Sequence, residues 1–374
     1  MLGSCLQVWA EPAEELIVSP HGVLMEATTG KILFEKDKDT KVSPASITKI
    51  MTLILIFDEL EKGSIQLTDE VVTSAFAKSM GGSQVFLEEG EKQTVETMIK
   101  CIVIASGNDA SVAMAEHIYG TEQDFVGRMN ERAAGLGMSG THFVDCCGLT
   151  DSVDHYTTAY DVALMSRELI VKYPQVLDYS SVWMEDITHV TQKGSKVFGL
   201  TNTNKLVRNY EGCLGLKTGS TSIAKYCVSA VATRNQVTLI SVIMTAPDYK
   251  VRFADAASLL NKGFGMCQVY TDENPPKLPM IRVKGALKKE TACVYDGVFH
   301  YVDTTQADLG QIQAALQVEE EVKAPVSKDD VAGHLVYTLD GEEIGRVEVR
   351  YATDCPRATY IEFLEDTANH LWLT

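Results

Sequence analysis

The first part of the chain carries an alternating apolar pattern that changes to a helical one. Residues 23–36 place β-branched and apolar side chains on both sides of a turn at Gly30, which predicts two neighbouring strands. Pro44 then suits the first turn of a helix. Apolar residues follow it at helical spacing, at Ile47, Ile50, Met51 and Leu55. Similar spacing predicts further helices at 95–106, 110–118, 125–136 and after the N-capping segment Thr158-Ala159-Tyr160-Asp161.

Strand-forming segments return near position 226. Residues 226–233 and 237–244 are apolar runs that predict adjacent strands, and 252–264 has the spacing of an amphipathic helix. Because strands lie at both ends of this part of the chain and helices lie between them, we expect an α+β domain with a helical subdomain.

The composition changes at Asp272-Glu273-Asn274-Pro275-Pro276, and short alternating segments dominate beyond it. Asp340-Gly341 lies between two of these segments, which is a strong signal for a β-hairpin. We therefore expect a first domain at 16–272 and a small all-β domain, a β-sandwich, at 276–366. Residues 1–15 are expected to be a signal-peptide remnant or a flexible tail. Residues 367–374 are expected to be the start of a truncated anchor segment.

Charge and cysteine spacing exclude several classes of protein. The net charge of −18 on 374 residues argues against nucleic acid or anionic lipid as the main partner, because both require clustered Lys and Arg. No apolar run reaches the roughly 18 residues that a membrane-spanning helix requires. No two cysteines have the C-x-x-C spacing of zinc ribbons or thioredoxin-type sites. We expect neither a metal nor another cofactor.

Three short motifs occur in an informative order: Ser46-Ile47-Thr48-Lys49, Ser106-Gly107-Asn108 and Lys217-Thr218-Gly219. Each motif alone is weak, and Ser222-Ile223-Ala224-Lys225 is a second copy of the first. Together and in this order, they match the motif set of serine enzymes that transfer acyl groups.

The chemistry explains why Ser46 is the better nucleophile. Residues three apart share a helix face, so Ser46 and Lys49 can place hydroxyl and amine within hydrogen-bond reach. The amine accepts a proton only where burial and a nearby cation lower its pKa, and Lys217 is the expected cation. The start of the helix also favours a developing oxyanion. Ser222 lies in a turn before a strand and lacks this setting.

With their flanking residues, these motifs resemble the low-molecular-mass penicillin-binding proteins, a family of serine D-alanyl-D-alanine carboxypeptidases. The resemblance implies that 16–272 is the catalytic D,D-peptidase domain, with the penicillin-binding fold of an antiparallel sheet and a helical subdomain. The similar stretches are 44–52, 105–110, 154–159, 202–206, 215–219, 251–253 and, in the family's C-terminal module, 335–347.

The resemblance also implies a role for each matching residue. Ser46 would be acylated by the penultimate D-alanine, Lys49 would be the general base, and Ser106 would pass a proton to the leaving D-alanine. A second group would bind the substrate: Asn108, Lys217, Thr218, Gly219, Ser220 and Arg252.

Within that second group, Asn108 would hold the peptide amide. Lys217, Thr218 and Arg252 would receive the terminal carboxylate. The backbone N–H of Ser220 would complete an oxyanion hole with that of the nucleophile.

The resemblance further implies partners and a location. The substrates would be peptidoglycan stem peptides ending in D-Ala-D-Ala, and β-lactam antibiotics would acylate the same serine. The protein would act outside the cytoplasm, at the outer face of the membrane or in the cell wall. It would associate peripherally with the membrane through a missing C-terminal segment.

Some residues depart from the family pattern, and other functions stay open. Asp145-Cys146-Cys147-Gly148 stands where relatives often have Asn-Pro-His-Gly, and Ser220–Lys225 lacks the acidic residues common there; both put the substrate preference in doubt. His155 is expected to be structural. The same mechanism also permits endopeptidase action on cross-links.

Two rival functions are weaker. A class A β-lactamase requires a glutamate for deacylation, and no Glu-x-x-Leu-Asn segment lies between Ser106 and Lys217. A non-catalytic wall-associated protein would be expected to have lost Ser46, Lys49 or Lys217, and all three are present.

Overall fold

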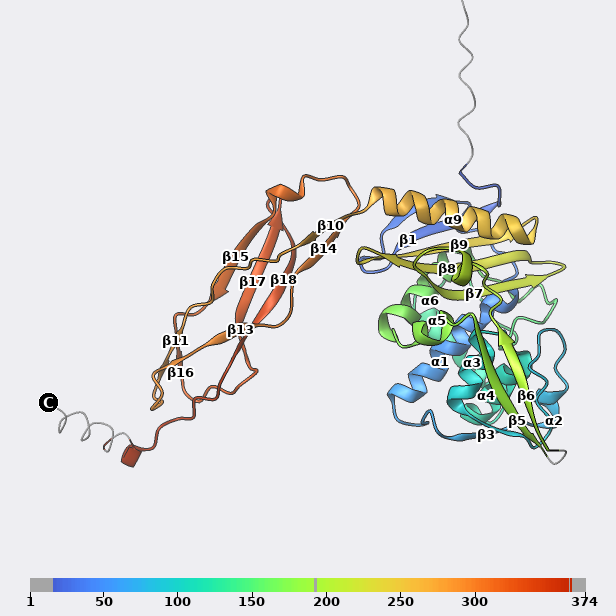
Figure 1. The fold of residues 1–374 in the computed structure, drawn as a ribbon, viewed down its shortest axis with the longest axis horizontal. Helices are drawn as coiled ribbons and strands as arrows, with labels where there is room; N and C mark the ends of the chain where they lie inside the picture. The colour runs from blue at the N-terminus through green and yellow to red at the C-terminus, as the bar shows by residue number, and fades with distance from the viewer. Residues whose placement is uncertain (1–15, 192–193, 363, 365–374) are drawn as a thin grey trace, which may run out of the picture. The chain divides into compact units, whose positions relative to one another are not determined.

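The computed structural model of the protein describes residues 16–191, 194–362 and 364. The chain divides into two compact units, Met1–Gly265 and Met266–Thr374 (Figure 1). The expected tail at 1–15 and the expected anchor segment at 367–374 lie outside the described residues.

A five-stranded sheet forms the frame of the first unit, in the order β2-β1-β9-β8-β7. Its strands are β1 (His21–Glu26), β2 (Ile32–Lys36), β7 (Cys213–Thr221), β8 (Lys225–Arg234) and β9 (Val237–Ala246). All neighbouring pairs are antiparallel. Among the described residues, β7 pairs only with β8, so one edge of β7 is open to another chain segment.

Helices cover both faces of this sheet (Figure 1). Helix α9 (Tyr249–Met266) packs on one face, where Gly263 lies so close to Leu24 and Leu239 that a Cβ would stand within 2.8 Å of either side chain. Helix α6 (Ala159–Lys172) packs against β1 and β9 on the other face. It begins where predicted, with the Thr158 hydroxyl accepting a hydrogen bond from the backbone N–H of Asp161.

Helix α1 (Lys49–Glu61) runs through the helical part of the unit, and its residues from Lys49 to Glu59 are all buried. A helix that is apolar nearly all round must be enclosed by other elements. It contacts α3 (Val95–Val103), α4 (Asn108–Tyr119), α5 (Glu122–Gly135) and α6. The other elements of this part are η1 (Ala45–Thr48), α2 (Ala75–Lys78), α7 (Val176–Ser180), α8 (Leu206–Asn209), β3 (Glu70–Val72) and β4 (Lys92–Thr94).

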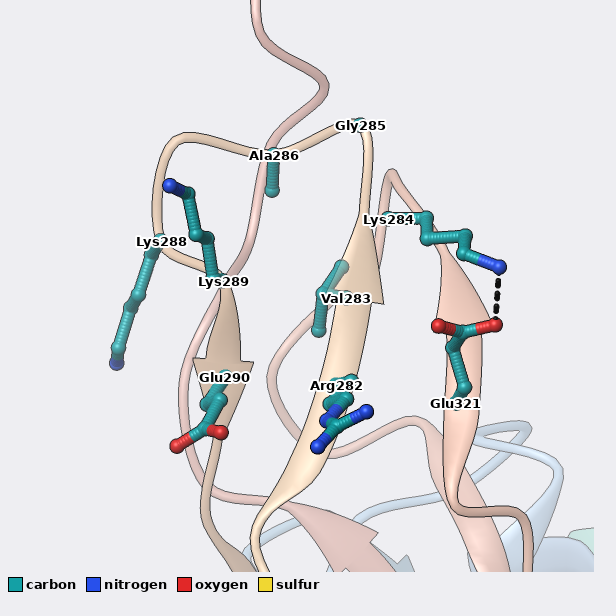
Figure 2. Close-up of a pocket in the computed structure, with 9 residues that line it drawn as sticks. All are labelled: Arg282, Val283, Lys284, Gly285, Ala286, Lys288, Lys289, Glu290 and Glu321. Atoms are coloured by element: carbon teal, nitrogen blue, oxygen red, sulfur yellow. Dashed lines mark ion pairs between the residues drawn. The ribbon is translucent and has the colours of Figure 1, made fainter. Parts of the chain in front are cut away.

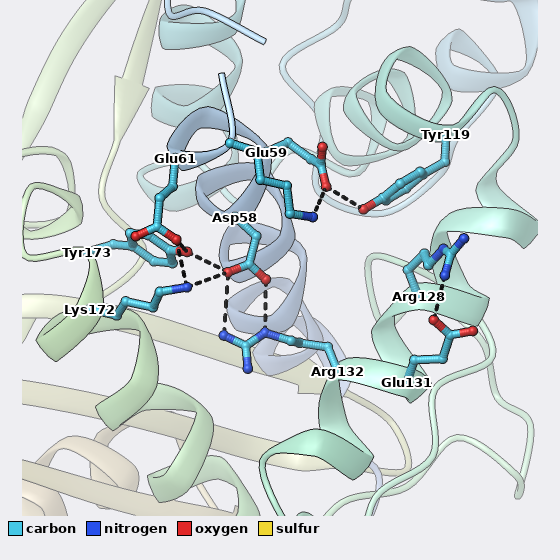
Figure 3. Close-up of polar contacts among 10 residues, drawn as sticks. Asp58, Glu59, Glu61, Tyr119, Arg128, Glu131, Arg132, Lys172 and Tyr173 are labelled. Atoms are coloured by element: carbon cyan, nitrogen blue, oxygen red, sulfur yellow. Dashed lines mark hydrogen bonds and ion pairs between the residues drawn. The ribbon is translucent and has the colours of Figure 1, made fainter. Parts of the chain in front are cut away.

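A polar network holds the C-terminal end of α1 to its neighbours (Figure 3). Asp58 accepts a 2.9 Å hydrogen bond from Arg132 Nε of α5, and further bonds from Lys172 of α6 and from the hydroxyl of Tyr173. Burial alone would raise the pKa of Asp58, but the bonds from Arg132 and Tyr173 lower it below its ordinary value. The network therefore fixes α1 against two helices.

The sequence missed or misplaced some elements of the first unit. It did not predict the exposed hairpin of β5 (Met184–Thr191) and β6 (Gly194–Thr201). The helix expected to begin at Arg252 begins instead at Tyr249, so Arg252 lies one turn inside α9.

The second unit consists of three small sheets. Their orders are β10-β14, β12-β11-β16 and β13-β18-β17-β15. The strands are β10 (Gln268–Thr271), β11 (Ile281–Lys284), β12 (Glu290–Thr291), β13 (Cys293–Tyr295), β14 (His300–Asp303), β15 (Gln313–Val318), β16 (Glu321–Lys323), β17 (Val331–Leu339) and β18 (Glu342–Tyr351), with a short helix η2 (Leu309–Gln311). The hairpin predicted at Asp340-Gly341 is confirmed, since β17 pairs with β18 there.

Strand β10 belongs to this second unit, because it pairs with β14. The sequence-based boundary at 272 falls after this strand. The core of the unit includes Phe299 and Tyr337, whose rings stack with centroids 3.8 Å apart. The Tyr337 hydroxyl donates to Asp272, which ties the first residues of the unit to its main sheet.

A cavity of about 680 Å³ lies in the second unit beside β11 (Figure 2). Basic side chains dominate its lining, among them Arg282, Lys288 and Lys289. Lys284 forms an ion pair with Glu321 at its edge. None of the described residues belongs to a helix long and apolar enough to cross a membrane.

Candidate active site

Ser46 and Lys49 meet at the junction of η1 and α1. Ser46 lies in the 3₁₀ turn, where residues three apart are eclipsed. The Lys49 Nζ atom donates to Ser46 Oγ at 3.0 Å. The predicted contact between hydroxyl and amine is therefore present, through a 3₁₀ turn rather than a regular helical turn.

The ammonium of Lys49 has two further partners. It donates to Asn108 Oδ1 at 2.6 Å and to the carbonyl of Cys147 at 2.8 Å. Asn108 opens α4, and its side-chain amide donates to the Gly81 carbonyl. Asn108 is thus held from both sides and positions Lys49 toward Ser46.

A second lysine reaches the same place from the edge of the sheet. Lys217 Nζ donates to Ser106 Oγ at 2.9 Å and to the Thr218 carbonyl at 3.1 Å. Ser106 connects α3 to α4 with a φ of 64°, a conformation that is strained for a residue with a side chain. The strain is compatible with a position that is constrained by function.

Burial controls the protonation of both lysines. Lys49 and Lys217 have no solvent exposure. Burial lowers the pKa of Lys49. Burial, together with repulsion from Lys49 and Arg252, lowers the pKa of Lys217 well below its ordinary value. Each amine can therefore lose its proton far more readily than a surface lysine.

The open edge of β7 faces the nucleophile through Gly219. A Cβ on Gly219 would lie 2.8 Å from the Pro44 carbonyl oxygen and 3.1 Å from the Ser46 backbone nitrogen. Any side chain here would separate β7 from η1. The next residue along β7 is Ser220, which brings its backbone to the same edge.

Two residues outside the three motifs, Thr203 and Asn204, hydrogen-bond to β7. Thr218 Oγ1 donates to Thr203 Oγ1 at 2.7 Å, and Asn204 Nδ2 donates to the Gly215 carbonyl at 2.8 Å. The segment Asn202-Thr203-Asn204 was a signal in the sequence, because it belongs to the resembling stretches, but it was given no role.

Arg252 braces the same strand. Its Nη1 donates to the carbonyls of Gly219 and Cys227 at 3.1 and 3.2 Å, and its Nε is buried without a partner among the described residues. The side chain is 9% exposed, so Arg252 is not a solvated residue at a helix start. Burial lowers its pKa.

Comparison with known proteins identifies the family. Residues 9–248 match the model described as D-alanyl-D-alanine carboxypeptidase of the peptidase S11 group. Residues 294–357 match the C-terminal domain of penicillin-binding protein 5. The chain belongs to the D-alanyl-D-alanine carboxypeptidase family.

Relatives and solved structures of the family match both units. The D-alanyl-D-alanine carboxypeptidase DacF of Bacillus subtilis is 38% identical over 346 residues, which cover 92% of this chain and 88% of that protein. DacC of Escherichia coli is 31% identical over 89% of this chain and 84% of its own. The crystal structure of penicillin-binding protein 5 from Haemophilus influenzae has a TM-score of 0.67 at 29% identity, covering 93% of this chain and all of that chain (100%). The predicted penicillin-binding fold with a C-terminal all-β domain is confirmed.

The segment that departs from the family pattern forms a tight loop beside Lys49. The Asp145 carboxylate accepts from the backbone N–H groups of Cys147, Gly148, Leu149 and Thr150. Burial would raise the pKa of Asp145, but nearby His155 and these backbone donors lower it. The loop turns the Cys147 carbonyl onto Lys49.

Gly148 and His155 connect this loop to η1. A Cβ on Gly148 would stand 1.8 Å from the Ala45 carbonyl oxygen, so no other residue fits. His155 hydrogen-bonds Thr48 Oγ1 at 2.8 Å through Nε2 and accepts from the Val144 N–H at 2.9 Å through Nδ1. Both ring nitrogens have structural partners, which agrees with the expected structural role of His155.

One group of side chains has the composition of a metal site. Ligand atoms of Glu122, Asp145 and Cys147 lie within 4.8 Å of one another. Both carboxylates already accept backbone N–H groups of the same loop, from Cys146 to Glu122 and from four residues to Asp145. Their arrangement is accounted for by the loop.

Proposed function

We propose that this protein is a serine D-alanyl-D-alanine carboxypeptidase that removes the terminal D-alanine from peptidoglycan stem peptides through an acyl-enzyme on Ser46. The observation that carries the proposal is the paired contact of Ser46 with Lys49 and of Ser106 with Lys217, at 3.0 and 2.9 Å. Nucleophile and base within hydrogen-bond reach are what acyl transfer requires.

Acylation begins at the penultimate D-alanine. Lys49, in its neutral form, takes the proton of Ser46 as the Oγ atom attacks the carbonyl carbon. The backbone N–H groups of Ser46 and Ser220 stabilise the resulting oxyanion. The peptide C–N bond then breaks, Ser106, held by Lys217, gives its proton to the leaving amine, and free D-alanine departs. Lys49 passes on to Ser106 the proton that it took from Ser46 and is neutral again for deacylation. Water hydrolyses the ester and restores Ser46.

Binding groups orient the substrate for this attack. Thr218, Lys217 and Arg252 receive the free terminal carboxylate, which limits cleavage to the last residue. Asn108 holds the amide of the acyl portion, and for this its side chain exchanges its present bond with Lys49 or with Gly81 for one with substrate. Gly219 lets the substrate backbone approach β7 as an added strand.

β-Lactam antibiotics present a reactive amide to the same groups, so Ser46 should also form a penicilloyl ester. The hydrogen-bond partners of Lys49 among the described residues are a hydroxyl, an amide and a backbone carbonyl. None of them is a carboxylate that could activate water in the manner of a class A β-lactamase. This supports a long-lived penicilloyl ester and a peptidase rather than a β-lactamase.

We further propose that the protein is exported and works at the outer face of the cytoplasmic membrane. The substrate class supports this, since peptidoglycan lies outside. Around the cavity of the second unit, Arg282, Lys288 and Lys289 cluster near Gly285, whose carbonyl accepts from the Ala358 N–H of the outgoing chain. These cations suit anionic headgroups during peripheral membrane association.

The test is the intact mass of the protein after exposure to benzylpenicillin, followed by peptide mapping. One penicilloyl group should appear on the peptide that contains Ser46. Ser46→Ala should abolish both this adduct and the release of D-alanine, whereas Ser222→Ala, in the second S-x-x-K copy, should abolish neither. An adduct on Ser222, or peptidase activity in Ser46→Ala, would refute the proposal.

A further inference from the structure

A cavity of about 370 Å³ is lined in part by the segment that leads to Ser46, and the mechanism above does not use it. Its lining comes from three segments: residues 41–43, which lead into η1, residues 151–156, and Ile223 in the turn after β7. The cavity therefore begins where the catalytic turn, the loop next to Lys49 and the end of the substrate-binding strand converge.

The direction of the substrate places one particular residue at this cavity. Lys217 and Thr218 bind the terminal carboxylate, and Ser46 faces Gly219, so the chain preceding the scissile bond runs alongside Ser220 and onward. An extended chain advances about 3.3 Å per residue. The residue before the two D-alanines thus lies level with the turn that holds Ile223.

The walls of the cavity suit a long side chain with an apolar stem. Val42 and the ring of Tyr156 line it, and the exposed side chains of Val153 and Ile223 stand at its rim, 90% and 55% exposed. Apolar side chains as exposed as these can pack against the methylene groups of a bound ligand.

Two charges of opposite sign also line the cavity, Lys41 and Asp151. The Lys41 ammonium stands 4.3 Å from the centroid of the Tyr156 ring. Neither charge has an ion-pair partner in the described part of the chain, and they do not pair with each other. One cation and one anion are thus available to a ligand.

We propose that this cavity binds the side chain of the residue that precedes D-Ala-D-Ala, and that it selects a diamino dicarboxylic acid, whose side chain ends in both an ammonium and a carboxylate. The carboxylate would pair with Lys41 and the ammonium with Asp151, while the stem packs between Val153 and Ile223. A lysine at the same position would satisfy Asp151 and leave Lys41 facing a like charge. The inference rests on the proposed function, since the direction of the substrate follows from it.

Two peptides that end in D-Ala-D-Ala and differ only in the preceding residue test this selection. One carries the diamino dicarboxylic acid and the other carries lysine, and kcat/KM is measured from released D-alanine. The first peptide should be preferred by about tenfold, the value of one charge-assisted contact. Lys41→Gln should remove the preference by slowing the first peptide alone, and Asp151→Asn should slow both peptides.

Controls separate this inference from the proposed function. Lys31→Gln removes an exposed cation at the opposite end of β2 and should leave the preference intact. Benzylpenicillin carries neither charge in its acyl side chain, so Lys41→Gln and Asp151→Asn should acylate at the wild-type rate. Equal kcat/KM for the two peptides, an unchanged preference in Lys41→Gln, or unchanged rates in Asp151→Asn would overturn the subsite while acylation of Ser46 would still stand. A loss of acylation in the wild type would instead contradict the proposed function.

Discussion

Two clusters of buried charge lie at opposite ends of α1 and differ in how the charge is compensated. At the first end, Lys49 and Lys217 are fully buried, and their partners are hydroxyls, an amide and carbonyls. At the other end, Asp58 is bonded to Arg132, Lys172 and Tyr173 (Figure 3). Charge pairing stabilises a buried ion, whereas a buried cation without an anion costs free energy. The end with uncompensated charge, at Lys49 and Lys217, is therefore the reactive end. The end with compensated charge, at Asp58, holds α1 to its neighbours and is called the structural anchor of α1 below.

The largest effect is expected from removing the base. Lys49→Met should lower the rate of Ser46 acylation by about 10²- to 10⁴-fold, the usual contribution of a general base. The free energy of unfolding should stay the same or rise, because an uncompensated buried amine is lost. Stopped-flow acylation by benzylpenicillin and urea unfolding measure the two quantities. A variant that is strongly destabilised would show that Lys49 is a structural residue.

The opposite result is expected at the anchor. Asp58→Asn removes the carboxylate that Arg132 and Lys172 share, although Arg132 keeps its ion pair with Glu168 and Lys172 keeps that with Glu61. Losing the charged hydrogen bonds of Asp58 should cost about 1.5 to 3 kcal/mol of unfolding free energy. Acylation of the folded fraction should stay within about twofold of wild type, because the substitution leaves the Ser46–Lys49 contact in place. Asp178→Asn, in the short helix α7, serves as a control for removing one carboxylate. If Asp58→Asn were acylated slowly but had the unfolding free energy of the wild type, the proposed difference between the two ends of α1 would be wrong.

The sequence predicted the reactive end better than the anchor, for a physical reason. Acyl transfer demands particular residue types at fixed spacing, so Ser46, Lys49, Ser106 and Lys217 were visible as motifs. Asp58 and Arg132 are ordinary charged residues, and only the packing of α1 against α5 brings them together. A pattern of single residues carries no signal for such a contact.

Two further features were also out of reach. The Cys147 carbonyl binds Lys49 through its backbone, and a backbone group leaves no trace in residue type. The β5–β6 hairpin has few buried positions, so its alternation of apolar and polar residues is weak. Conversely, the strong signals of β8, β9 and the Asp340-Gly341 hairpin were confirmed, because each segment is packed on one or both faces.

The structure adds a second effect to the expected interaction between Lys217 and Lys49. Sequence reasoning expected Lys217 to lower the pKa of Lys49. In the structure, repulsion from Lys49, after burial, lowers the pKa of Lys217 itself. Repulsion between two cations is reciprocal, so protonation of either amine lowers the pKa of the other. The two lysines therefore titrate as a pair, and either amine can be the neutral one.

The smallest expected difference between the two ends of α1 is in how the stability that each contributes depends on pH. The pKa values of Lys49 and Lys217 are lower in the folded protein than in the unfolded chain. As pH falls below the ordinary value of 10.5, the unfolded chain therefore binds protons before the folded protein does. This end therefore loses stability as pH falls toward the folded-state pKa values. Asp58 has a lowered pKa too, but its carboxylate contributes stability above its ordinary value of 3.8, which is lost as pH falls through the folded-state value.

The acylation rate should follow the lysine end alone. Acylation requires neutral Lys49, so the rate constant should rise with pH along a limb that lies below 10.5. Lys217→Met removes the neighbouring cation and should move this limb to higher pH, because Lys49 then holds its proton more tightly. Lys172→Met removes a cation at the anchor and should leave the limb in place. The position of the limb, rather than the rate at its plateau, is the measured quantity, since Lys217 also contacts Ser106. A limb that stays fixed in Lys217→Met, or a rate that falls as pH rises, would show that the two buried lysines do not act as an electrostatic pair.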